Sequence, residues 1–588
     1  MTRHRSRPVP TPRRSLALVV LALVVLAPVV AGCAPGGATP APTPPPSVPA
    51  AASPTAPSIA CEPATTPAAD DWNERVWYEV FVRSYADSDG DGIGDLRGLT
   101  ARLDHLNDGD PATTDDLGVG GLWLMPIAES VSYHGYDVTD YRAVEPDYGT
   151  LEDLRALLDA AHARGMRVIV DFVPNHSSSE HPWFREALVP GSPRDPWYVW
   201  SDEFPGWGGP GGEVVWREGG DRWYYAYFSE SMPELDLTDP EVTAEFREIA
   251  RYWVEEVGVD GFRIDAAKHL IATGKDAQVN TPETLAWLAG LRESLGGTLP
   301  DGGDPLLVGE VWDLAVVAGA YVPDSLDLTF DFGLATGVRL GLENGRAGPL
   351  RTALLDTVRW WPPNRNATFL SNHDQDRIAS SLRGDGDALR LGAFLLMTLP
   401  GVPFLYYGEE IGLTGRKPDE RIRTPLQWSE ERPGAGFTSG TPWEPLAEMP
   451  AGTSVAAQRA DPTSLLAAYR TLIAARAAEA PLRTGGTAVL ETGSESVAAW
   501  LRTTAGRTLL VVANLGEEPV GDYALRLDAG PVCGPVVPSL VTSVGAVAGT
   551  AGLAAPSLTA SGGLDGYRPL PVLPPRSGLV IALEPAAP

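Results

Sequence analysis

From residue 76 onward, short apolar runs alternate with longer segments in which apolar residues recur at helical spacing. An apolar run of about four to eight residues between turn residues is typical of a buried strand. Amphipathic helices are predicted between several of these runs, for example at 151–164 and 241–257. The predicted strands are Val76–Val82, Gly121–Ile127, Arg167–Val173, Val259–Ile264, Leu306–Val311, Leu326–Phe332, Ala367–Leu370 and Val402–Tyr407. Strands that alternate with helices in this way predict the α/β class with a parallel sheet, and eight of them suffice to close a (β/α)8 TIM barrel.

One connection in this pattern is much longer than the others. Residues 177–237 separate the third predicted strand from the helix before the fourth, and they are rich in tryptophan, glycine and proline. A long insertion in a barrel loop usually forms a cleft wall or a small subdomain. Aromatic rings suit the apolar faces of sugars, but packing within the insertion is the expected role of any single tryptophan. The tryptophans are Trp183, Trp197, Trp200, Trp207, Trp216 and Trp223.

The pattern changes after residue 484. Short alternating segments, such as 496–501 and 508–514, are separated by turns rich in glycine and proline. This predicts an antiparallel β domain at 485–588, so that the barrel and its insertion would span 71–484.

The first 32 residues have the features of an export signal. Five arginines form a basic region: Arg3, Arg5, Arg7, Arg13 and Arg14. The apolar stretch at 16–30 is short for a membrane span and leads into Ala31-Gly32-Cys33, which resembles the bacterial lipobox. We expect lipidation of Cys33, with ordinary cleavage after a small residue as the alternative. Residues 33–70, rich in proline, alanine and threonine, would then tether an extracellular lipoprotein to the bacterial cell membrane.

Composition narrows the possible partners. The formal net charge is −31, and loss of the arginine-rich signal would bring it to −36. Such a charge argues against binding to nucleic acid or to anionic membranes, so membrane contact is expected only through the lipid anchor. Cys61 and Cys533 would be the remaining cysteines. In an exported chain they are expected to form a disulfide, and two unrelated thiols are the alternative.

Polar motifs follow four of the predicted strands, at Asp171–His176, Gly261–Asp265, Gly309–Val311 and Ser371–Asp374. A TIM barrel carries its chemistry at the carboxyl ends of its strands. Three carboxylates delivered there by different strands indicate acid/base and nucleophilic work on a glycosidic bond.

Asp265 is the candidate nucleophile. Arg263 lies two residues earlier, on the same side of the strand, where its charge would keep Asp265 ionised; a structural ion pair is the alternative. Glu310, one strand–helix unit later and among apolar neighbours, is the candidate general acid. Retaining glycosidases hold these two carboxyl groups ~5–5.5 Å apart, and barrel strands ~4.8 Å apart can deliver that spacing.

A third carboxylate comes from Asp374, which could accept hydrogen bonds from two sugar hydroxyls. His373 beside it and His176 after the third strand are candidate donors to the same sugar. A lone histidine is more often structural, but four polar motifs at four strand ends favour one shared site.

Together and in this order, the motifs resemble the conserved regions of the α-amylase family, glycoside hydrolase family 13, over roughly residues 72–585. The resemblance implies that Asp265 is the nucleophile, Glu310 the acid/base and Asp374 the residue that strains the substrate towards the transition state. The residues that would bind the sugar at the cleavage subsite are Arg263, His176 and His373, with Tyr136 as the aromatic platform. The insertion and the C-terminal β domain would be the family's domains B and C.

Three features bear on the position within the family. Lys268-His269 resembles the pair that lines the leaving-group side in true α-amylases. Tyr133 stands where exo-acting α-glucosidases of the family carry an aspartate that closes the non-reducing end. Met232–Asp236 resembles a form of the fifth conserved region between those of oligo-1,6-glucosidases and neopullulanases. These features imply an intermediate group of lipoprotein or secreted α-amylases.

The segment Asp87-Ser-Asp-Gly-Asp-Gly-Ile-Gly-Asp95 indicates a Ca²⁺ loop. Alternating carboxylates and glycines let a backbone wrap a hard cation. The segment lacks the last glutamate of an EF-hand and resembles the loop after the first barrel strand in the oligo-1,6-glucosidase-like branch. The ligands implied are Asp87, Asp89, Asp91, Asp95 and the Ile93 carbonyl. An acidic turn without metal is the alternative, and a second calcium at Asn175 stays open.

The leading hypothesis is a monomeric, retaining, endo-acting α-1,4-glucan hydrolase that cleaves starch and maltooligosaccharides, with Ca²⁺ as its cofactor. A 4-α-glucanotransferase or other transglycosylase would use the same carboxylates with a sugar as acceptor, and an α-glucosidase is a third reading. A non-catalytic glucan-binding surface protein is the reading from another class. Retention of all three candidate carboxylates argues against that last reading.

Overall fold

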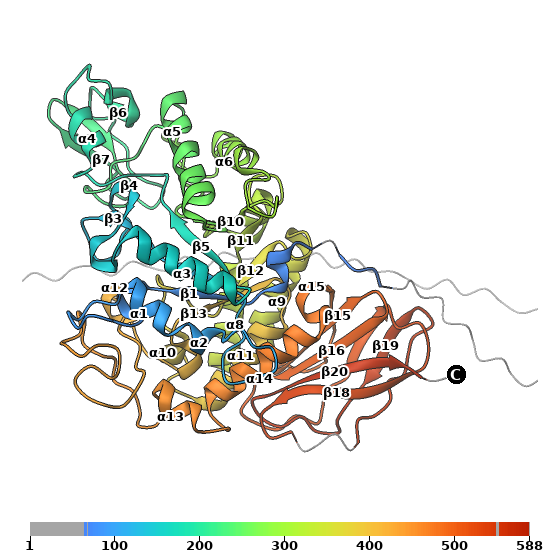
Figure 1. Cartoon of the computed structure of the whole chain (residues 1–588). Helices are drawn as coiled ribbons and strands as arrows, with labels where there is room; N and C mark the ends of the chain where they lie inside the picture. Colours follow the sequence, from blue (N-terminus) through green and yellow to red (C-terminus); the bar gives the residue numbers. More distant parts are fainter. Residues whose placement is uncertain (1–63, 68, 548–551, 587–588) are drawn as a thin grey trace, which may run out of the picture. The chain divides into compact units, whose positions relative to one another are not determined.

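Eight parallel strands close into a barrel in the structure, a computed structural model that describes residues 64–67, 69–547 and 552–586. The strands are β1 (Trp77–Val80), β2 (Gly121–Leu124), β5 (Arg167–Phe172), β9 (Gly261–Ile264), β10 (Leu306–Gly309), β11 (Leu328–Phe330), β12 (Asn366–Thr368) and β13 (Val402–Tyr406). They follow one another around the barrel in this order, and β13 pairs with β1 to close it. The predicted (β/α)8 barrel is confirmed (Figure 1).

Large apolar side chains fill the barrel interior. Every residue of β1, β2, β9 and β10 is buried. A strand that faces the barrel interior on one side and the helices on the other has no solvent face, so its sequence is mostly apolar rather than alternating. Glu79 and Arg263 are the charged residues of these four strands. The interior cluster includes Trp77, Trp123, Ile169, Val308, Phe330 and Phe404.

Helices surround the barrel and occupy the loops at its ends (Figure 1). They are α1 (Leu96–Ala101), α2 (Leu103–Leu106), α3 (Leu151–Ala163), α4 (Pro182–Ala187), α5 (Pro240–Arg251), α6 (Pro282–Leu295), α7 (Ala315–Ala318), α8 (Phe332–Asn344), α9 (Ala347–Trp360), α10 (Ile378–Ser381), α11 (Gly386–Thr398), α12 (Asp419–Ile422), α13 (Val455–Arg459), α14 (Leu465–Ala478) and α15 (Ala480–Thr484).

In helix α5 the sequence determines where the helix begins, but the predicted end of the helix is not correct. Asp239 caps its N-terminus, Pro240 is its first residue, and its buried apolar residues recur at helical spacing. The single helix predicted at 241–257 is only partly correct, because Tyr252–Val257 form a π-helix. This segment ends at Gly258, whose φ of 100° suits glycine.

The insertion after β5 forms a small β unit of its own. Its sheet has the order β6 (Trp200–Ser201), β8 (Arg222–Tyr225) and β7 (Trp216–Gly219). All six of its tryptophans pack against other rings; Trp183, for example, lies 4.8 Å from Trp197 between ring centroids. Packing, the role expected of any single tryptophan, therefore accounts for the whole set.

The C-terminal region is an antiparallel β domain, as predicted. Its main sheet has the order β14-β15-β16-β20-β18, and β17 pairs with β19. Trp500 Nε1 donates to the Thr398 carbonyl of α11 (3.2 Å), and Arg576 Nη1 donates to the Leu342 carbonyl of α8 (2.7 Å), so the domain is bonded to two barrel helices. The strands are β14 (Gly486–Val489), β15 (Val497–Thr504), β16 (Arg507–Asn514), β17 (Leu525–Ala529), β18 (Val536–Val544), β19 (Gly562–Tyr567) and β20 (Ser577–Pro585).

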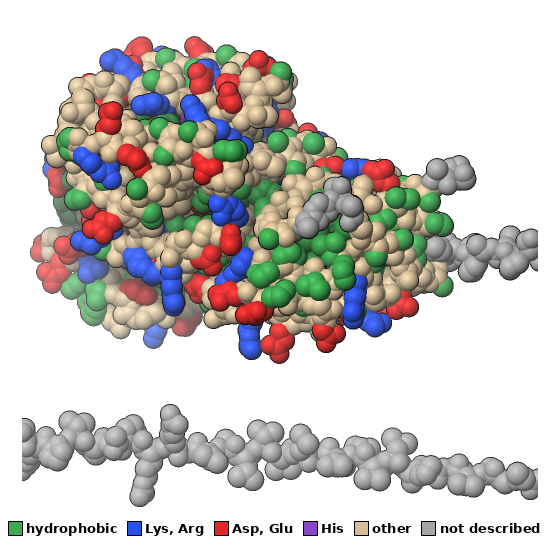
Figure 2. Space-filling view, turned by 90° about the horizontal axis from the view of Figure 1, so that it is seen from below, with side chains coloured by type: hydrophobic (Ala, Val, Ile, Leu, Met, Phe, Trp, Pro, Cys, Tyr) green, Lys and Arg blue, Asp and Glu red, His purple; other side chains and the backbone are tan. Residues whose placement is uncertain are grey.

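Charged side chains of both signs are interspersed over the face of the molecule seen in Figure 2. Hydrophobic side chains gather on the right of that view, the side of the C-terminal sheet. On this face the negative net charge is therefore spread among mixed charges rather than collected in one acidic area.

Several predictions fall outside the described residues: the signal peptide, the lipidated Cys33, nearly all of the tether, and Cys61. Cys533 is disulfide-bonded, and its pairing with Cys61 stays a prediction. Across the described ranges, no helix is long and apolar enough to cross a membrane.

Candidate active site

Arg263 in β9 lies at the centre of the site and joins three carboxyl groups. Its side chain is 1% exposed. Nη1 donates to Asp171 Oδ1 (2.7 Å) and Asp265 Oδ1 (2.6 Å), and Nη2 donates to Glu310 Oε2 (2.8 Å). Strands β9 and β10 pair in a register that sets Ile264 beside Gly309, so Asp265 and Glu310 leave the barrel side by side. The sequence-predicted pair is thus brought together by one guanidinium.

Burial raises the pKa values of this cluster, and nearby cations, chiefly Arg263, oppose that rise. Burial raises the pKa of Asp265 and of Glu310 above their ordinary values, and Arg263 opposes the rise in both. Burial also raises the pKa of Asp171 to about 7. Arg263 therefore acts on the Asp265 pKa in the predicted direction, but burial outweighs it. One cation that faces three carboxyl groups favours retention of a proton in the cluster.

Asp171 is a residue of the cluster that the sequence analysis did not assign, although it begins one of the motifs. It is the penultimate residue of β5, and Trp123 Nε1 donates to its Oδ2 (3.0 Å). Tyr136 OH lies 3.4 Å from the same oxygen. Asp171 therefore holds Arg263 from the side opposite Glu310.

His373 forms a second node of the site. Its Nδ1 lies 2.6 Å from Glu79 Oε1, and its Nε2 lies 2.7 Å from Tyr136 OH and 3.2 Å from Asp374 Oδ2. Burial lowers the pKa of His373, but Asp374 and Glu79 outweigh it and raise the pKa to about 10. His373 is therefore an imidazolium at neutral pH. Glu79, the acidic residue in the otherwise apolar β1, was also missed by the sequence analysis.

Asp374 is held by two cations. Arg423, which follows α12, donates from Nη2 to Asp374 Oδ1 (3.0 Å) and from Nε to the His373 carbonyl (2.9 Å). Burial would raise the pKa of Asp374, but His373 and Arg423 lower it well below its usual range. The Asp374 side chain is 30% exposed, so an ionised carboxylate faces the opening of the site.

His176 and Tyr136 each lie next to another ring: the His176 ring is 5.4 Å from the Phe228 ring between centroids, and the Tyr136 ring contacts His373. Asn175 Nδ2 lies 3.2 Å from His176 Nδ1; an amide can only donate there, which assigns the ring proton to Nε2. By hydrogen-bond geometry His176 Nε2 has no partner among the described residues. Burial lowers the His176 pKa to about 4, although the nearby Tyr136 backbone opposes this shift. His176 thus offers a neutral donor. The Tyr136 ring stacks on His373, with centroids 5.8 Å apart.

Lys268 and His269 lie beyond Glu310, in a pocket of about 380 Å³. Lys268 Nζ donates to the Trp312 carbonyl (2.6 Å), and His269 packs 4.4 Å from Tyr227 between ring centroids. Burial lowers the pKa of His269 to about 3, so it is neutral. Two exposed rings complete the pocket, Phe228 (46% exposed) and Trp312 (47%), which the sequence analysis did not single out.

The acidic loop before α1 gathers three of the predicted calcium ligands. Oxygens of Asp87, Asp89 and Asp95 all lie within 4.8 Å of one another. Asp91 is outside this group, and its Oδ1 accepts from the Ile93 amide (2.7 Å). Gly90 and Gly92, with φ of 89° and 100°, let the loop curl around the carboxylates. An all-oxygen donor set of this kind fits Ca²⁺.

The comparisons with known proteins agree with this geometry. The family described as "Alpha amylase, catalytic domain" matches residues 79–485. "Alpha-amylase 3" of Dictyoglomus thermophilum is 37% identical over 453 residues, which cover 76% of this chain and 85% of that protein. "Trehalose synthase" of Thermus thermophilus is 32% identical over 507 residues, covering 76% and 50%.

Among solved structures, the α-amylase from H. orenii superimposes with a TM-score of 0.72 at 36% identity, over 87% of this chain and 99% of that one. A trehalulose synthase superimposes with a TM-score of 0.72 at 25% identity. The chain therefore belongs to the α-amylase family, glycoside hydrolase family 13, whose members here include hydrolases and enzymes named as synthases.

Proposed function

We propose that the protein is a retaining, endo-acting α-1,4-glucan hydrolase, an α-amylase that cleaves starch and maltooligosaccharides. The observation that carries the reaction type is the orientation of the two carboxyl groups. In the described structure, the Arg263 and Ala266 hydrogen bonds to Glu310 both fall on Oε2, and the Arg263 bond to Asp265 falls on Oδ1. Glu310 Oε1 and Asp265 Oδ2 are thereby left to act on a substrate.

In the first step, Asp265 Oδ2 attacks the anomeric carbon while Glu310 gives its proton to the glycosidic oxygen. The raised pKa of Glu310 supports the proton that this step needs. Tyr136 supplies a face for the sugar ring, and the His176 Nε2 proton and the Asp374 carboxylate bond its hydroxyls. Arg263 stays charged and stabilises the carboxylate that each group becomes in turn.

In the second step, the ionised Glu310 removes a proton from water, which attacks the anomeric carbon and releases Asp265. Two inversions at that carbon return the sugar with its α configuration. The released sugar of the first step would leave through the pocket of Lys268 and His269. A neutral imidazole and two exposed rings beside Glu310 suit an uncharged sugar there.

Endo-action is supported by two depressions beside the catalytic pair, which adjoin at Trp312. Glu310 and Trp312 line one pocket, and Asp374 and Trp312 line a larger groove. A chain interior can lie across such a site, whereas an exo-enzyme closes one end. Tyr133 packs its ring on Trp443, 5.3 Å between centroids, where an end-closing aspartate would stand in an exo-glucosidase.

The test is substitution of the two carboxyl groups. Asp265→Asn and Glu310→Gln should each lower the rate of starch hydrolysis by about 10³-fold or more, because each removes one group that the chemical steps require. The exposed Glu230→Gln serves as a matched control and should keep wild-type activity. Near-normal activity in either site variant would exclude the assignment.

A transglycosylase is the second candidate function, and the exposed rings Phe228 and Trp312 favour it as a platform for an acceptor sugar. Maltotriose separates the two candidates. A hydrolase releases mainly glucose and maltose, whereas transfer gives longer oligosaccharides in excess. A time course on soluble starch and on pullulan tests the linkage: a broad early ladder from starch with little attack on pullulan supports an α-amylase.

We also propose that the acidic loop holds Ca²⁺ as a structural ion, far in sequence from the catalytic residues, and that the protein is an exported lipoprotein. Asp87, Asp89 and Asp95 support the first proposal by their grouping. The Cys33 motif supports the second. Growth with labelled palmitate tests it: label should enter the wild-type protein and not the Cys33→Ala variant.

A further inference from the structure

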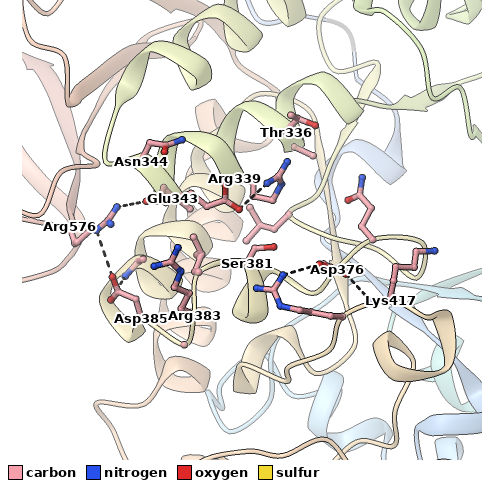
Figure 3. Close-up of a pocket in the computed structure, with 18 of the residues that line it drawn as sticks. Thr336, Arg339, Glu343, Asn344, Asp376, Ser381, Arg383, Asp385, Lys417 and Arg576 are labelled. Atoms are coloured by element: carbon pink, nitrogen blue, oxygen red, sulfur yellow. Dashed lines mark hydrogen bonds and ion pairs between the residues drawn. The ribbon is translucent and has the colours of Figure 1, made fainter. Parts of the chain in front are cut away.

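A groove of about 880 Å³ leads away from the catalytic site towards the C-terminal domain. Its lining includes Trp312 and Asp374, which belong to the catalytic region, and Arg576 and Glu517, which belong to the C-terminal domain. Helix α8 contributes Thr336, Arg339, Glu343 and Asn344 to one wall, and the segment after α10 contributes the other (Figure 3). The groove is thus continuous with the site but reaches a second domain.

The charges that line the groove cancel. Its five cationic residues are Arg339, Arg383, Arg416, Lys417 and Arg576, and its five acidic residues are Glu343, Asp374, Asp376, Asp385 and Glu517. Most of them form ion pairs with each other: Arg339 with Glu343 (2.8 Å), Arg416 with Asp376 (3.1 Å) and Arg576 with Glu517 (3.1 Å). In a chain with a net charge of −31, five cations gathered in one groove are notable. Because they are matched, the lining selects for neither an anion nor a cation.

A neutral ligand with many hydroxyl groups fits this lining. A partly exposed arginine in an ion pair still has donors to spare, since a guanidinium carries five N–H groups, and its carboxylate partner still has lone pairs. The hydroxyls of Thr336 and Ser381 add groups that can donate or accept (Figure 3).

The groove also begins at an aromatic platform. The Trp312 ring stacks on Phe332 with centroids 4.6 Å apart and an angle of 7°, and it remains 47% exposed. A ring fixed from behind and open in front offers a rigid apolar face at low entropic cost. Such a face pairs with the apolar face of a pyranose.

We propose that this groove binds further glucose units of an α-glucan, beyond those held at the catalytic residues, along a path from Trp312 to Arg576. The proposal rests on the proposed glucan hydrolase function. The units could be the distal part of a linear chain or an α-1,6-linked side chain, and the chemistry recognised is the same. In this account the C-terminal domain contributes directly to substrate binding, through Arg576 and Glu517.

The experiment blocks the groove without touching the catalytic residues. Thr336 lies exposed on α8, so Thr336→Trp fills the groove while the helix keeps its buried face. Thr471→Trp, which adds the same bulk to an exposed position of α14, is the matched control. Arg339→Ala removes a donor without added bulk and guards against a folding defect in the tryptophan variant.

We expect Thr336→Trp to raise KM about tenfold and Arg339→Ala about threefold for substrates that reach the groove, with kcat unchanged. Maltotriose should be cleaved with the same KM by all variants. A rise with both maltoheptaose and a branched dextrin assigns the groove to a linear chain, and a rise with the branched dextrin alone assigns it to the side chain. Unchanged KM values on both long substrates would overturn the proposal.

A binding experiment tests the groove independently of the proposed hydrolase activity. Maltoheptaose and the branched dextrin are titrated calorimetrically into the full-length Glu310→Gln protein, with and without Thr336→Trp. Loss of about tenfold in affinity supports the groove even if the wild-type protein hydrolyses neither substrate, which alone would count against the hydrolase. Equal affinity with and without Thr336→Trp overturns the groove.

Discussion

Arg263 in the barrel and Arg502 in the C-terminal sheet are both fully buried, but they have different partners. Arg263 bonds to three carboxyl groups, those of Asp171, Asp265 and Glu310. Arg502 bonds to the carbonyls of Pro481 (2.9 Å) and Leu482 (3.1 Å) and to the Thr487 hydroxyl (2.8 Å). The neighbouring carboxylates raise the pKa of Arg263 well above its ordinary value, whereas burial lowers that of Arg502 to about 9.

The difference shows that the partners, rather than burial, mark a functional residue. Carbonyl and hydroxyl dipoles satisfy a buried cation without adding negative charge, so Arg502 joins β15 to α15 and to β14. Three carboxyl groups around one cation leave an excess of negative charge, which raises pKa values and keeps a proton available. The buried arginine of the barrel therefore supports a reactive site, whereas the buried arginine of the C-terminal sheet holds structural elements together.

Substitution of the two arginines should give the largest effect, on both activity and stability. Arg263→Gln leaves three buried carboxyl groups without a cation, so activity should fall by about 10³-fold or more and stability by about 3–5 kcal/mol. Arg502→Met should cost about 1–3 kcal/mol through unbonded carbonyls but keep kcat per folded molecule. Urea unfolding and kcat are measured for both. A loss of kcat in Arg502→Met similar to that in Arg263→Gln would break the comparison.

The next effect extends the comparison to His373, a second buried cation held by carboxylates. Glu79→Gln removes one of the two groups that raise the His373 pKa, so His373 should lose its proton at lower pH and release Asp374. We expect kcat/KM to fall about 10–100-fold and the alkaline limb of its pH profile to move to lower pH. An unchanged alkaline limb would show that Glu79 does not act through His373.

Stability should depend on pH through the same pair. The folded pKa of His373, about 10, lies above the ordinary value of about 6.5, so the bonds to its charged form stabilise the fold fully below about pH 6.5. This contribution is lost as the pH rises towards 10. The urea midpoint of the wild-type protein should therefore fall between pH 6.5 and 10, and that of Glu79→Gln should fall less. If the urea midpoints of the wild-type protein and of Glu79→Gln fell equally with pH, the role of Glu79 in raising the His373 pKa would be contradicted.

The smallest effect is expected on Tm, from the Asp87–Asp95 loop, whose carboxylates have no buried arginine beside them among the described residues. Removal of metal with a chelator should lower Tm by a few degrees, because Ca²⁺ binds the folded Asp87–Asp95 loop only. Asp89→Asn should abolish that response. Asp91→Asn is the matched control and should weaken it less, since Asp91 lies outside the group formed by Asp87, Asp89 and Asp95. A Tm that is indifferent to chelator and to added Ca²⁺ would leave an acidic turn without metal.

The sequence alone was sufficient for elements whose signal is local. All eight barrel strands were predictable, because each lies in a short, mostly apolar run flanked by turns. Asp265, Glu310 and Asp374 were predictable because each follows such a run. The Trp-rich insertion was predictable as a unit, whereas the π-helix at Tyr252–Val257 was not, since its residues read as ordinary helix.

Residues that act through distant partners were not predictable. Glu79 meets His373 across 294 positions of the chain, and Arg423 reaches Asp374 from a segment after the last barrel strand. A single acidic residue within β1 gives no indication in the sequence of which residue it contacts. Trp312 was missed for a similar reason: its role follows from stacking on Phe332, which the fold brings beneath it.

The central claim, that Asp265 is the nucleophile and Glu310 the acid/base, is tested most directly by trapping the intermediate. α-Maltosyl fluoride needs no proton to lose fluoride, so the full-length Glu310→Gln protein should form the bond from Asp265 to the anomeric carbon yet fail to activate water for its release. Intact mass spectrometry should show one added maltosyl group, and peptide mapping should place it on Asp265. An adduct on another residue, or equal labelling of the Asp265→Asn/Glu310→Gln double variant, would contradict the account.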